Sequence, residues 1–159
     1  MFSAPSTGSD AIAQRRDLLS AADSITQGEP DGVANMANVS ALIMQIWPDL
    51  NWAGFYRVVG DSLVLGPFQG KAACIRIAQG RGVCGAAWES GKTQLVPDVH
   101  AFPGHIACDA DSRSELVVPV IRDDAVVAVI DLDSPLPARF DEQDAACLEE
   151  LARMIATRI

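Results

Sequence analysis

An α+β domain built on an antiparallel sheet is the fold class that this 159-residue sequence predicts. Near both ends of the chain, apolar residues recur every three or four positions, which is typical of amphipathic helices. In the middle, short segments rich in β-branched and aromatic residues are joined by tight turns, which is typical of hairpins. Two helices, a strand-rich middle and a last helix therefore predict an antiparallel sheet with helices packed on it.

The N-terminal third is predicted to hold two helices and the C-terminus a third. The first helix spans about 10–26, the second ends at Pro48, and the last starts at the N-cap Asp141. Their apolar stripes are Ile12, Leu18, Leu19, Ala22 and Ile25; Met36, Val39, Ile43 and Ile46; and Ala145, Leu148, Leu151 and Ile155.

The middle of the chain is predicted to form the sheet. A hairpin, 52–59 and 62–68, turns at Gly60-Asp61, and a second, 115–121 and 125–132, turns at residues 122–124. Between the hairpins we expect a short strand at 74–78, a short helix at about 83–89, a strand at 93–96 and an irregular loop at 97–113.

Composition indicates one globular domain. Apolar residues make up 49% of the chain and charged residues 21%, and the length suits a single core. We expect residues 10–159 to form this domain, with 1–9, rich in Ser, Pro and Gly, as a flexible N-terminus. The formal net charge of −9 argues against nucleic-acid or anionic membrane partners.

The location of the protein is predicted from what the sequence lacks. No run of eighteen apolar residues predicts a membrane span, and MFSAPSTGSD is not a secretory leader. We therefore expect a cytoplasmic protein, in which cysteines stay reduced unless redox chemistry is their function.

Two aromatic residues and three acids form the first candidate site. Side chains two apart in a strand share a face, so Trp52 and Tyr56 lie on one side with Gly54 leaving space between them. Asp131 and Asp133 likewise share a face, in line with Val127 and Val129, and Glu115 starts the neighbouring strand. This placement allows two interpretations.

Carboxylates on the apolar side of a strand are costly unless they are paired. The residues alone favour solvated acids beyond the strand end, or acids that cap a turn before Pro135. The alternative is a pocket in which Glu115, Asp131 and Asp133 hold a cationic group, with aromatic side chains covering its apolar part.

The four cysteines differ in their surroundings, and none forms a C-x-x-C pair. Cys108 lies in the polar stretch GHIACDADSRSE, which predicts an exposed loop. Cys84 lies in the first turn of a helix, where the helix dipole favours a thiolate, although a core position is an equal alternative. Cys74, at a strand start, and Cys147, on the last helix, have the pattern of small core residues.

Two histidines near Cys108 raise the question of a metal. His100 and His105 could ligate a metal ion together with Cys108, but the paired spacing of structural zinc sites is missing. We therefore interpret the histidines as hydrogen-bonding loop residues and expect neither a metal nor an organic cofactor.

Six segments, in order and spacing, resemble one known family. They are NWAGFY, LGPFQGKAAC, GRGVCG, DVHAFPGHIACDADSRSE, PV and IDLDS, all between Asn51 and Ser134. This set is similar to the free methionine-(R)-sulfoxide reductases, which are single GAF-domain enzymes. The resemblance extends from about Ala11 to Met154 and implies a GAF-like antiparallel sheet flanked by N-terminal and C-terminal helices.

The resemblance also implies roles for the cysteines and the acids. Cys108 matches the family's nucleophile, Cys74 its resolving cysteine, and Cys84 a supporting or alternative thiol. The family's ligand pocket matches the second interpretation of the acids, with Trp52, Tyr56, Glu115, Asp131 and Asp133 binding the substrate.

The implied activity is reduction of free methionine-R-sulfoxide through a sulfenic acid and an intramolecular disulfide. Thioredoxin or a similar dithiol would then reduce the disulfide, and a homodimer is a plausible assembly. The main alternative is a non-catalytic GAF sensor of a small ligand or of oxidation, followed by a metal-binding module.

Overall fold

Six antiparallel strands form one sheet in the order β3-β2-β1-β6-β5-β4 in the computed structural model, which describes residues 10–106 and 108–159. The predicted flexible N-terminus, 1–9, lies outside the described residues. The elements are α1 (Ala11–Thr26), α2 (Gly32–Ile46), β1 (Trp52–Val59), β2 (Ser62–Gly70), β3 (Arg76–Ala78), α3 (Gly82–Ser90), β4 (Gln94–Val96), η1 (Val99–Ala101), β5 (Ser114–Arg122), β6 (Ala125–Ser134) and α4 (Glu142–Ile155). The α+β prediction is confirmed.

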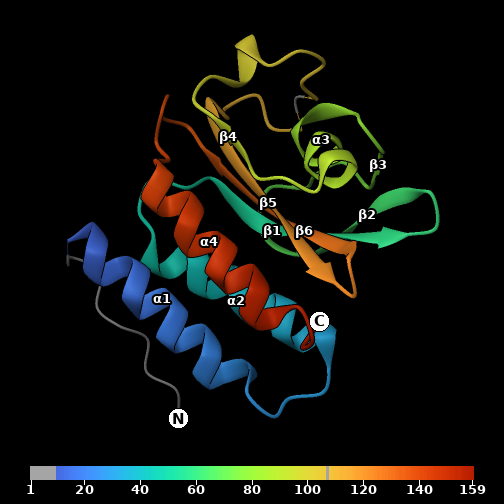
Figure 1. Cartoon of the computed structure of the whole chain (residues 1–159). Coiled ribbons are helices and arrows are strands. Elements are labelled where there is room, and N and C mark those ends of the chain that lie inside the picture. The colour runs from blue at the N-terminus through green and yellow to red at the C-terminus, as the bar shows by residue number, and fades with distance from the viewer. Residues whose placement is uncertain (1–9, 107) are drawn as a thin grey trace.

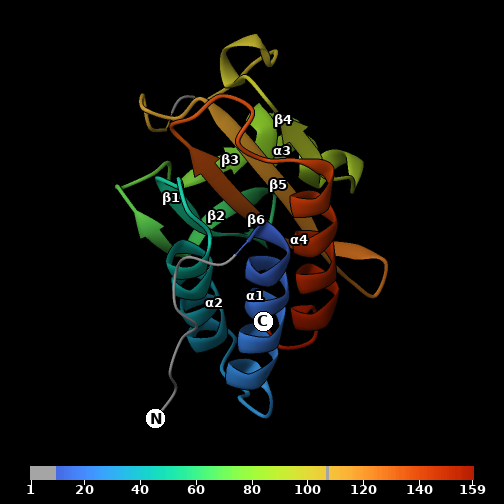
Figure 2. The ribbon, with the colours of Figure 1, turned by 90° about the vertical axis from the view of Figure 1, so that its left-hand side faces the viewer.

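The sheet separates two layers (Figures 1 and 2). Helices α1, α2 and α4 pack side by side on one face, where they bury the main hydrophobic core together with sheet residues such as Phe55 and Ile130. Helix α3 and the segments around it cover the opposite face. A second, smaller core lies there, and it contains Trp52, Tyr56, Cys84 and Val129.

Aspartates fix the starts of the three long helices. The side chain of Asp10 accepts a hydrogen bond from the backbone N–H of Ala13, and Asp31 caps α2 in the same way. Asp141 and Asp144 form a reciprocal capping box at the start of α4, as the predicted N-cap at Asp141 requires. No described helix has both the length and the hydropathy needed to cross a membrane.

The predicted hairpins are present. Gly60 turns the β1–β2 hairpin with φ 63°, and Asp123 and Asp124 turn the β5–β6 hairpin with φ 51° and 61°. Because Asp tolerates the left-handed region, two consecutive aspartates suit this tight turn.

The predicted irregular loop at 97–113 is present among the described residues, and it contains one short 3₁₀ helix, η1. Three other local predictions are wrong. Ile12 is 75% exposed and does not join the α1 stripe. Strand β3 begins at Arg76, so Cys74 lies in the segment before it. Val127 is an extra residue in the pairing of β6 with β5, so it packs against the helix layer instead of lining up with Val129.

Candidate active site

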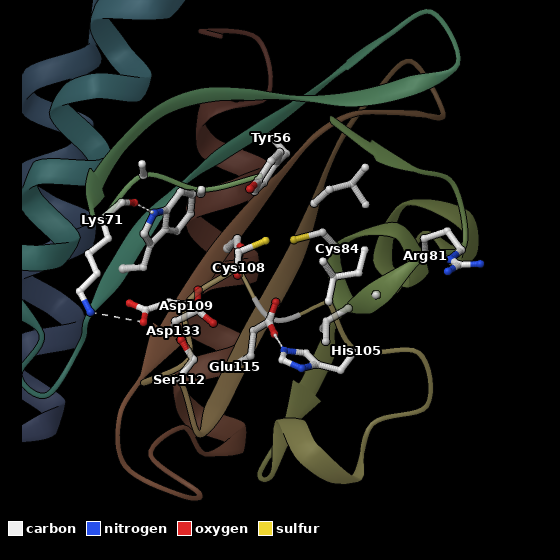
Figure 3. Close-up of a pocket in the computed structure, with 18 residues that line it drawn as sticks. Tyr56, Lys71, Arg81, Cys84, His105, Cys108, Asp109, Ser112, Glu115 and Asp133 are labelled. Carbon is white, nitrogen blue, oxygen red and sulfur yellow. Dashed lines mark hydrogen bonds and ion pairs between the residues drawn. The ribbon is translucent and has the colours of Figure 1, made fainter. Parts of the chain in front are cut away.

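A pocket opens on the α3 side of the sheet (Figure 3). Of the site residues predicted from the sequence, all but Cys74 line this pocket. Strands β1, β5 and β6 supply its floor, the start of α3 forms one wall, and its rim is formed by residues 71–73, 105, 106 and 108–112. The lining residues are Trp52, Tyr56, Lys71, Ala72, Ala73, Ile77, Arg81, Gly82, Val83, Cys84, His105, Ile106, Cys108, Asp109, Ser112, Glu115, Asp131 and Asp133.

The aromatic wall is a stack of three rings. The ring of Trp52 lies 5.9 Å from that of Tyr56 and 5.1 Å from that of Phe68, centroid to centroid. A Cβ on Gly54 would overlap Phe68 and come within 2.8 Å of Trp52, so the predicted space at Gly54 is required. Phe68 belongs to this aromatic wall but was not predicted from the sequence.

Both pocket aromatics also hold the segment that carries Cys74. The indole N–H of Trp52 donates to the carbonyl of Lys71 at 3.1 Å, and the Tyr56 hydroxyl donates to the carbonyl of Cys74 at 3.0 Å. The segment before β3 is therefore fixed against the apolar wall of the pocket.

The three acids converge, so the interpretation of them as solvated residues is wrong. Glu115 pairs with Asp133 across β5 and β6, and Asp131 lies two residues before Asp133 on the same face. Glu115 and Asp131 are each 6% exposed, whereas Asp133 is partly exposed. Helix α3, His105, Ile106 and residues 108–112 lie over these strand ends, which is why Glu115 and Asp131 are shielded from water.

Burial and mutual repulsion make these acids retain protons. Loss of water raises the pKa of Asp131 to about 6, while desolvation and the charges of the neighbouring acids raise the pKa values of Glu115 and Asp133 well above their usual range. Among the described residues, Oδ1 of Asp131 has no hydrogen-bond partner although it is buried. The cluster can therefore both donate protons and accept a cationic donor.

Cys74 and Cys108 form a disulfide across 34 residues of chain, with their Cα atoms 5.8 Å apart. Cys108 is exposed in the loop, as predicted, and Cys74 is partly buried. The pocket thus has a disulfide at its rim and acids at its floor.

Cys84 is a buried free thiol. The predicted thiolate at the helix start is not favoured, because burial, and then the charges of Asp131 and Glu115, raise the pKa of Cys84 well above its usual value. These effects outweigh the helix dipole. Cys84 points across the pocket toward Cys108 (Figure 3). Cys147 is core, as predicted, and burial raises its pKa to about 12.

The two histidines do not form a metal site with Cys108. His100 is exposed beside Asp98, whereas Nε2 of His105 lies 3.7 Å from Oε2 of Glu115 (Figure 3). Burial lowers the pKa of His105, so its ring is neutral at pH 7. Within 10–106 and 108–159, the one group of three metal-ligating side chains with ligand atoms within 4.8 Å is Cys84, Glu115 and Asp131.

Several residues at the rim were not singled out from the sequence. Asn51 donates to Asp109 and Ser112, each at 3.1 Å, and Lys71 contacts Asp109. Asn51 and Asp109 stand inside the recognisable segments NWAGFY and DVHAFPGHIACDADSRSE, which is the signal that could have found them.

Known proteins share this architecture. A model of the GAF domain matches residues 34–159. The free methionine-R-sulfoxide reductase of Escherichia coli (strain K12) is 46% identical over 139 residues, covering 87% of this chain and 84% of that protein. The enzyme of the same name from Saccharomyces cerevisiae is 44% identical over 146 residues, covering 87% and 81%.

A solved structure extends the similarity to three dimensions. The free methionine-R-sulfoxide reductase from Neisseria meningitidis, determined in complex with its substrate, has a TM-score of 0.95 to this chain at 46% identity. The match covers 99% of this chain and 95% of that one. A match over this share of both chains spans the segments that line the pocket as well as the sheet.

Proposed function

Because this chain belongs to the free methionine-R-sulfoxide reductases of the GAF-domain family, we propose that it reduces free L-methionine-(R)-sulfoxide to methionine. The observation that carries this proposal is a Cys74–Cys108 disulfide at the rim of a pocket with three acids at its floor. The three acids suit a ligand with a cationic amino group, and the two cysteines suit a reduction that ends in a disulfide.

The acids bind the substrate by its charge. Free methionine sulfoxide carries an ammonium group, and Glu115, Asp131 and Asp133 offer carboxylate oxygens to it, including the unpartnered Oδ1 of Asp131. Trp52 and Tyr56 enclose the S-methyl group. A buried ion pair of this kind discriminates strongly, since removing one partner leaves the other charge unpaired.

Cys108 performs the reduction. Its thiolate attacks the sulfoxide sulfur, and an acid of the cluster gives a proton to the sulfoxide oxygen. The attack forms a bond between the two sulfurs. The S–O bond then breaks as the hydroxyl passes to Cys108, and the bond between the sulfurs breaks as methionine leaves, so Cys108 becomes a sulfenic acid. The substrate sulfur gains two electrons, which the cysteine sulfur loses.

Cys74 completes the cycle. Its thiol attacks the sulfenic sulfur of Cys108, the disulfide forms and water leaves. Thioredoxin or a similar dithiol then reduces the disulfide by exchange and becomes oxidised itself. Cys84 has a supporting role, because its buried thiol lies in one cluster with Glu115 and Asp131, with their ligand atoms within 4.8 Å of one another, and helps to orient these carboxyls.

The setting of the reaction follows from the same residues. The thiols need a reducing compartment to complete the cycle, so we place the protein in the cytoplasm. A homodimer would cover exposed apolar side chains on α1 and α2, where Ile12 and Val33 are 75% and 57% exposed. Sedimentation of the protein over a range of concentrations tests that assembly.

The decisive assay supplies the separate R and S epimers of free methionine sulfoxide together with a dithiol reductant and measures methionine. Continuous release of methionine from the R epimer is the expected result. Consumption of a single equivalent, with no further turnover in the presence of reductant, would indicate a redox sensor and refute the enzyme.

A further inference from the structure

Asp109 has no part in the chemistry above, although it follows Cys108 directly in the chain. Its side chain is only 9% exposed, whereas Cys108 before it and Ala110 after it are exposed. A carboxylate withdrawn from water needs several hydrogen bonds to offset the lost hydration. The donors that surround Asp109 therefore show what this loop is attached to.

Donors reach Asp109 from three parts of the chain. Nδ2 of Asn51 donates to its Oδ2 at 3.1 Å, and the backbone N–H of Asp111 donates to its Oδ1 at 2.9 Å. Nζ of Lys71 lies 3.5 Å from the same Oδ1 (Figure 3). These donors lower the pKa of Asp109, the Asp111 N–H having the largest effect, so the group is charged at neutral pH.

Two of the donors are themselves fixed to the site. The backbone N–H of Asn51 donates to the carbonyl of Asp133 at 3.0 Å, which attaches Asn51 to the sheet beside the acids. Lys71 precedes Cys74 by three residues, and its carbonyl accepts from Trp52. Asp109 consequently joins the Cys108 segment both to the sheet and to the segment of the resolving cysteine.

Asp111 also forms an ion pair with Lys71, but unlike Asp109 it is not shielded from water. Its Oδ2 lies 2.6 Å from Nζ of Lys71, but both side chains are 67% exposed. Ion pairs in water contribute little to order. Asp111 therefore offers a matched control two residues away.

We propose that Asp109 is a positioning residue for disulfide formation, which holds Cys108 where the Cys74 sulfur can reach it through bonds to Asn51 and Lys71. This inference rests on the roles proposed above for the two cysteines. In that step the sulfur of Cys74 forms a bond to the sulfur of Cys108, the S–O bond of the sulfenic acid breaks, and the oxygen takes up a proton and leaves as water. A segment released from Asp109 presents the sulfenic sulfur in many positions, which slows the attack.

The test separates this step from the formation of the sulfenic acid. Reduced protein is treated with hydrogen peroxide, which converts the Cys108 thiolate into a sulfenic acid, in the presence of a cyclic 1,3-diketone that traps it. The ratio of trapped Cys108 to Cys74–Cys108 disulfide reports how fast Cys74 attacks, regardless of how fast the sulfenic acid formed. Because peroxide starts the reaction, the result does not depend on turnover of methionine sulfoxide.

Asp109→Ala is expected to raise the ratio of trapped to disulfide-bonded Cys108 by about tenfold, since a small misplacement of reacting atoms has a large effect on rate. Asn51→Ala should raise it similarly, and the double variant should be no worse than the worse single variant, because both remove one interaction. Asp109→Asn keeps a hydrogen-bond acceptor but loses the charge, so its ratio should lie between those of the wild type and Asp109→Ala. Asp111→Asn should match the wild type.

Thermal unfolding of each variant shows whether it is folded. If Asp109→Ala does not fold, the Asn51→Ala and Asp109→Asn variants test the same contact. An Asp109→Ala ratio equal to that of Asp111→Asn would overturn the proposal. Fully additive effects of Asp109→Ala and Asn51→Ala would overturn it as well, because they would show that the two side chains do not act through each other.

Discussion

The two halves of the pocket are built in opposite ways. The acids and the aromatic wall lie on paired strands above the main core, and Glu115, Asp131, Trp52 and Tyr56 are all at most 6% exposed. The disulfide joins the segment before β3 to the long segment after β4, and Cys108 is exposed. A recognition half on a rigid sheet and a reactive half on connecting segments suit a thiol that must meet first a substrate and then a second thiol.

The largest effects on methionine release are expected when the two cysteines of the reactive half are replaced. Cys108→Ser should abolish even the first release of methionine, because no sulfenic acid forms. Cys74→Ser should release about one equivalent per site and then stall under thioredoxin, since exchange needs a disulfide to attack. Methionine measured after mixing reduced protein with substrate checks this, and equal loss of the first release in both variants would refute the assigned roles.

The acid half should determine the size of the substrate. N-acetylation removes the positive charge that the acids bind, so kcat/KM should fall by about a hundredfold or more for N-acetyl methionine sulfoxide. Asp131→Asn and Asp133→Asn should impair the free amino acid most. Steady-state kinetics on both substrates provides the measurement, and comparable kcat/KM values for the two would contradict an acidic clamp.

The same acids should make the folded protein less stable as the pH rises. The pKa of Asp131 is about 6 in the folded state and 3.8 is its ordinary value, so folding binds a proton between those pH values. The free energy that this group contributes is present below the ordinary pKa and is lost as pH rises through the folded one. Asp131→Asn does not titrate and avoids that loss.

Urea unfolding of wild type and Asp131→Asn at several pH values checks the sign. As pH rises from about 4 to 7, the free energy of unfolding of Asp131→Asn should increase relative to that of the wild type, by an amount of the order of 1–3 kcal/mol. A difference that stays constant over this range would mean that Asp131 is not a buried, proton-binding acid.

The smallest effect is expected at the fourth cysteine. Cys147 lies on α4 in the main core, on the opposite face of the sheet from the pocket, and its thiol contacts the carbonyl of Arg15. Cys147→Ala should leave the turnover of methionine sulfoxide at the wild-type value and lower the stability by about 1 kcal/mol. A large loss of activity at unchanged stability would show that chemistry is not confined to the pocket side.

Local patterns predicted those parts of the site that depend on strand alternation and turn chemistry. The shared face of Trp52 and Tyr56, and that of Asp131 and Asp133, follows from the period of two in a strand. The exposure of Cys108 follows from its polar neighbours, and the N-cap at Asp141 from the preference of helix starts for aspartate.

Predictions failed where distant segments decide the environment. The burial of Asp131 depends on α3 and on residues 105, 106 and 108–112, which lie over the strand ends and which strand alternation cannot reveal. Cys84 is another case, because burial beside the acids outweighs the dipole of its own helix. The bond between Asn51 and Asp109 joins residues 58 positions apart, and the shift at Val127 depends on pairing with β5.

In the proposed cycle, Cys108 takes the oxygen of the free amino acid, and Cys74, not Cys84, forms the disulfide with it. Disulfide mapping by peptide mass spectrometry, after reduced protein meets one equivalent of free methionine-R-sulfoxide per site, tests it most directly. We expect one methionine released per site and a Cys74–Cys108 link, with Cys84 still a free thiol. A Cys84–Cys108 link, or methionine released without any disulfide, would contradict it.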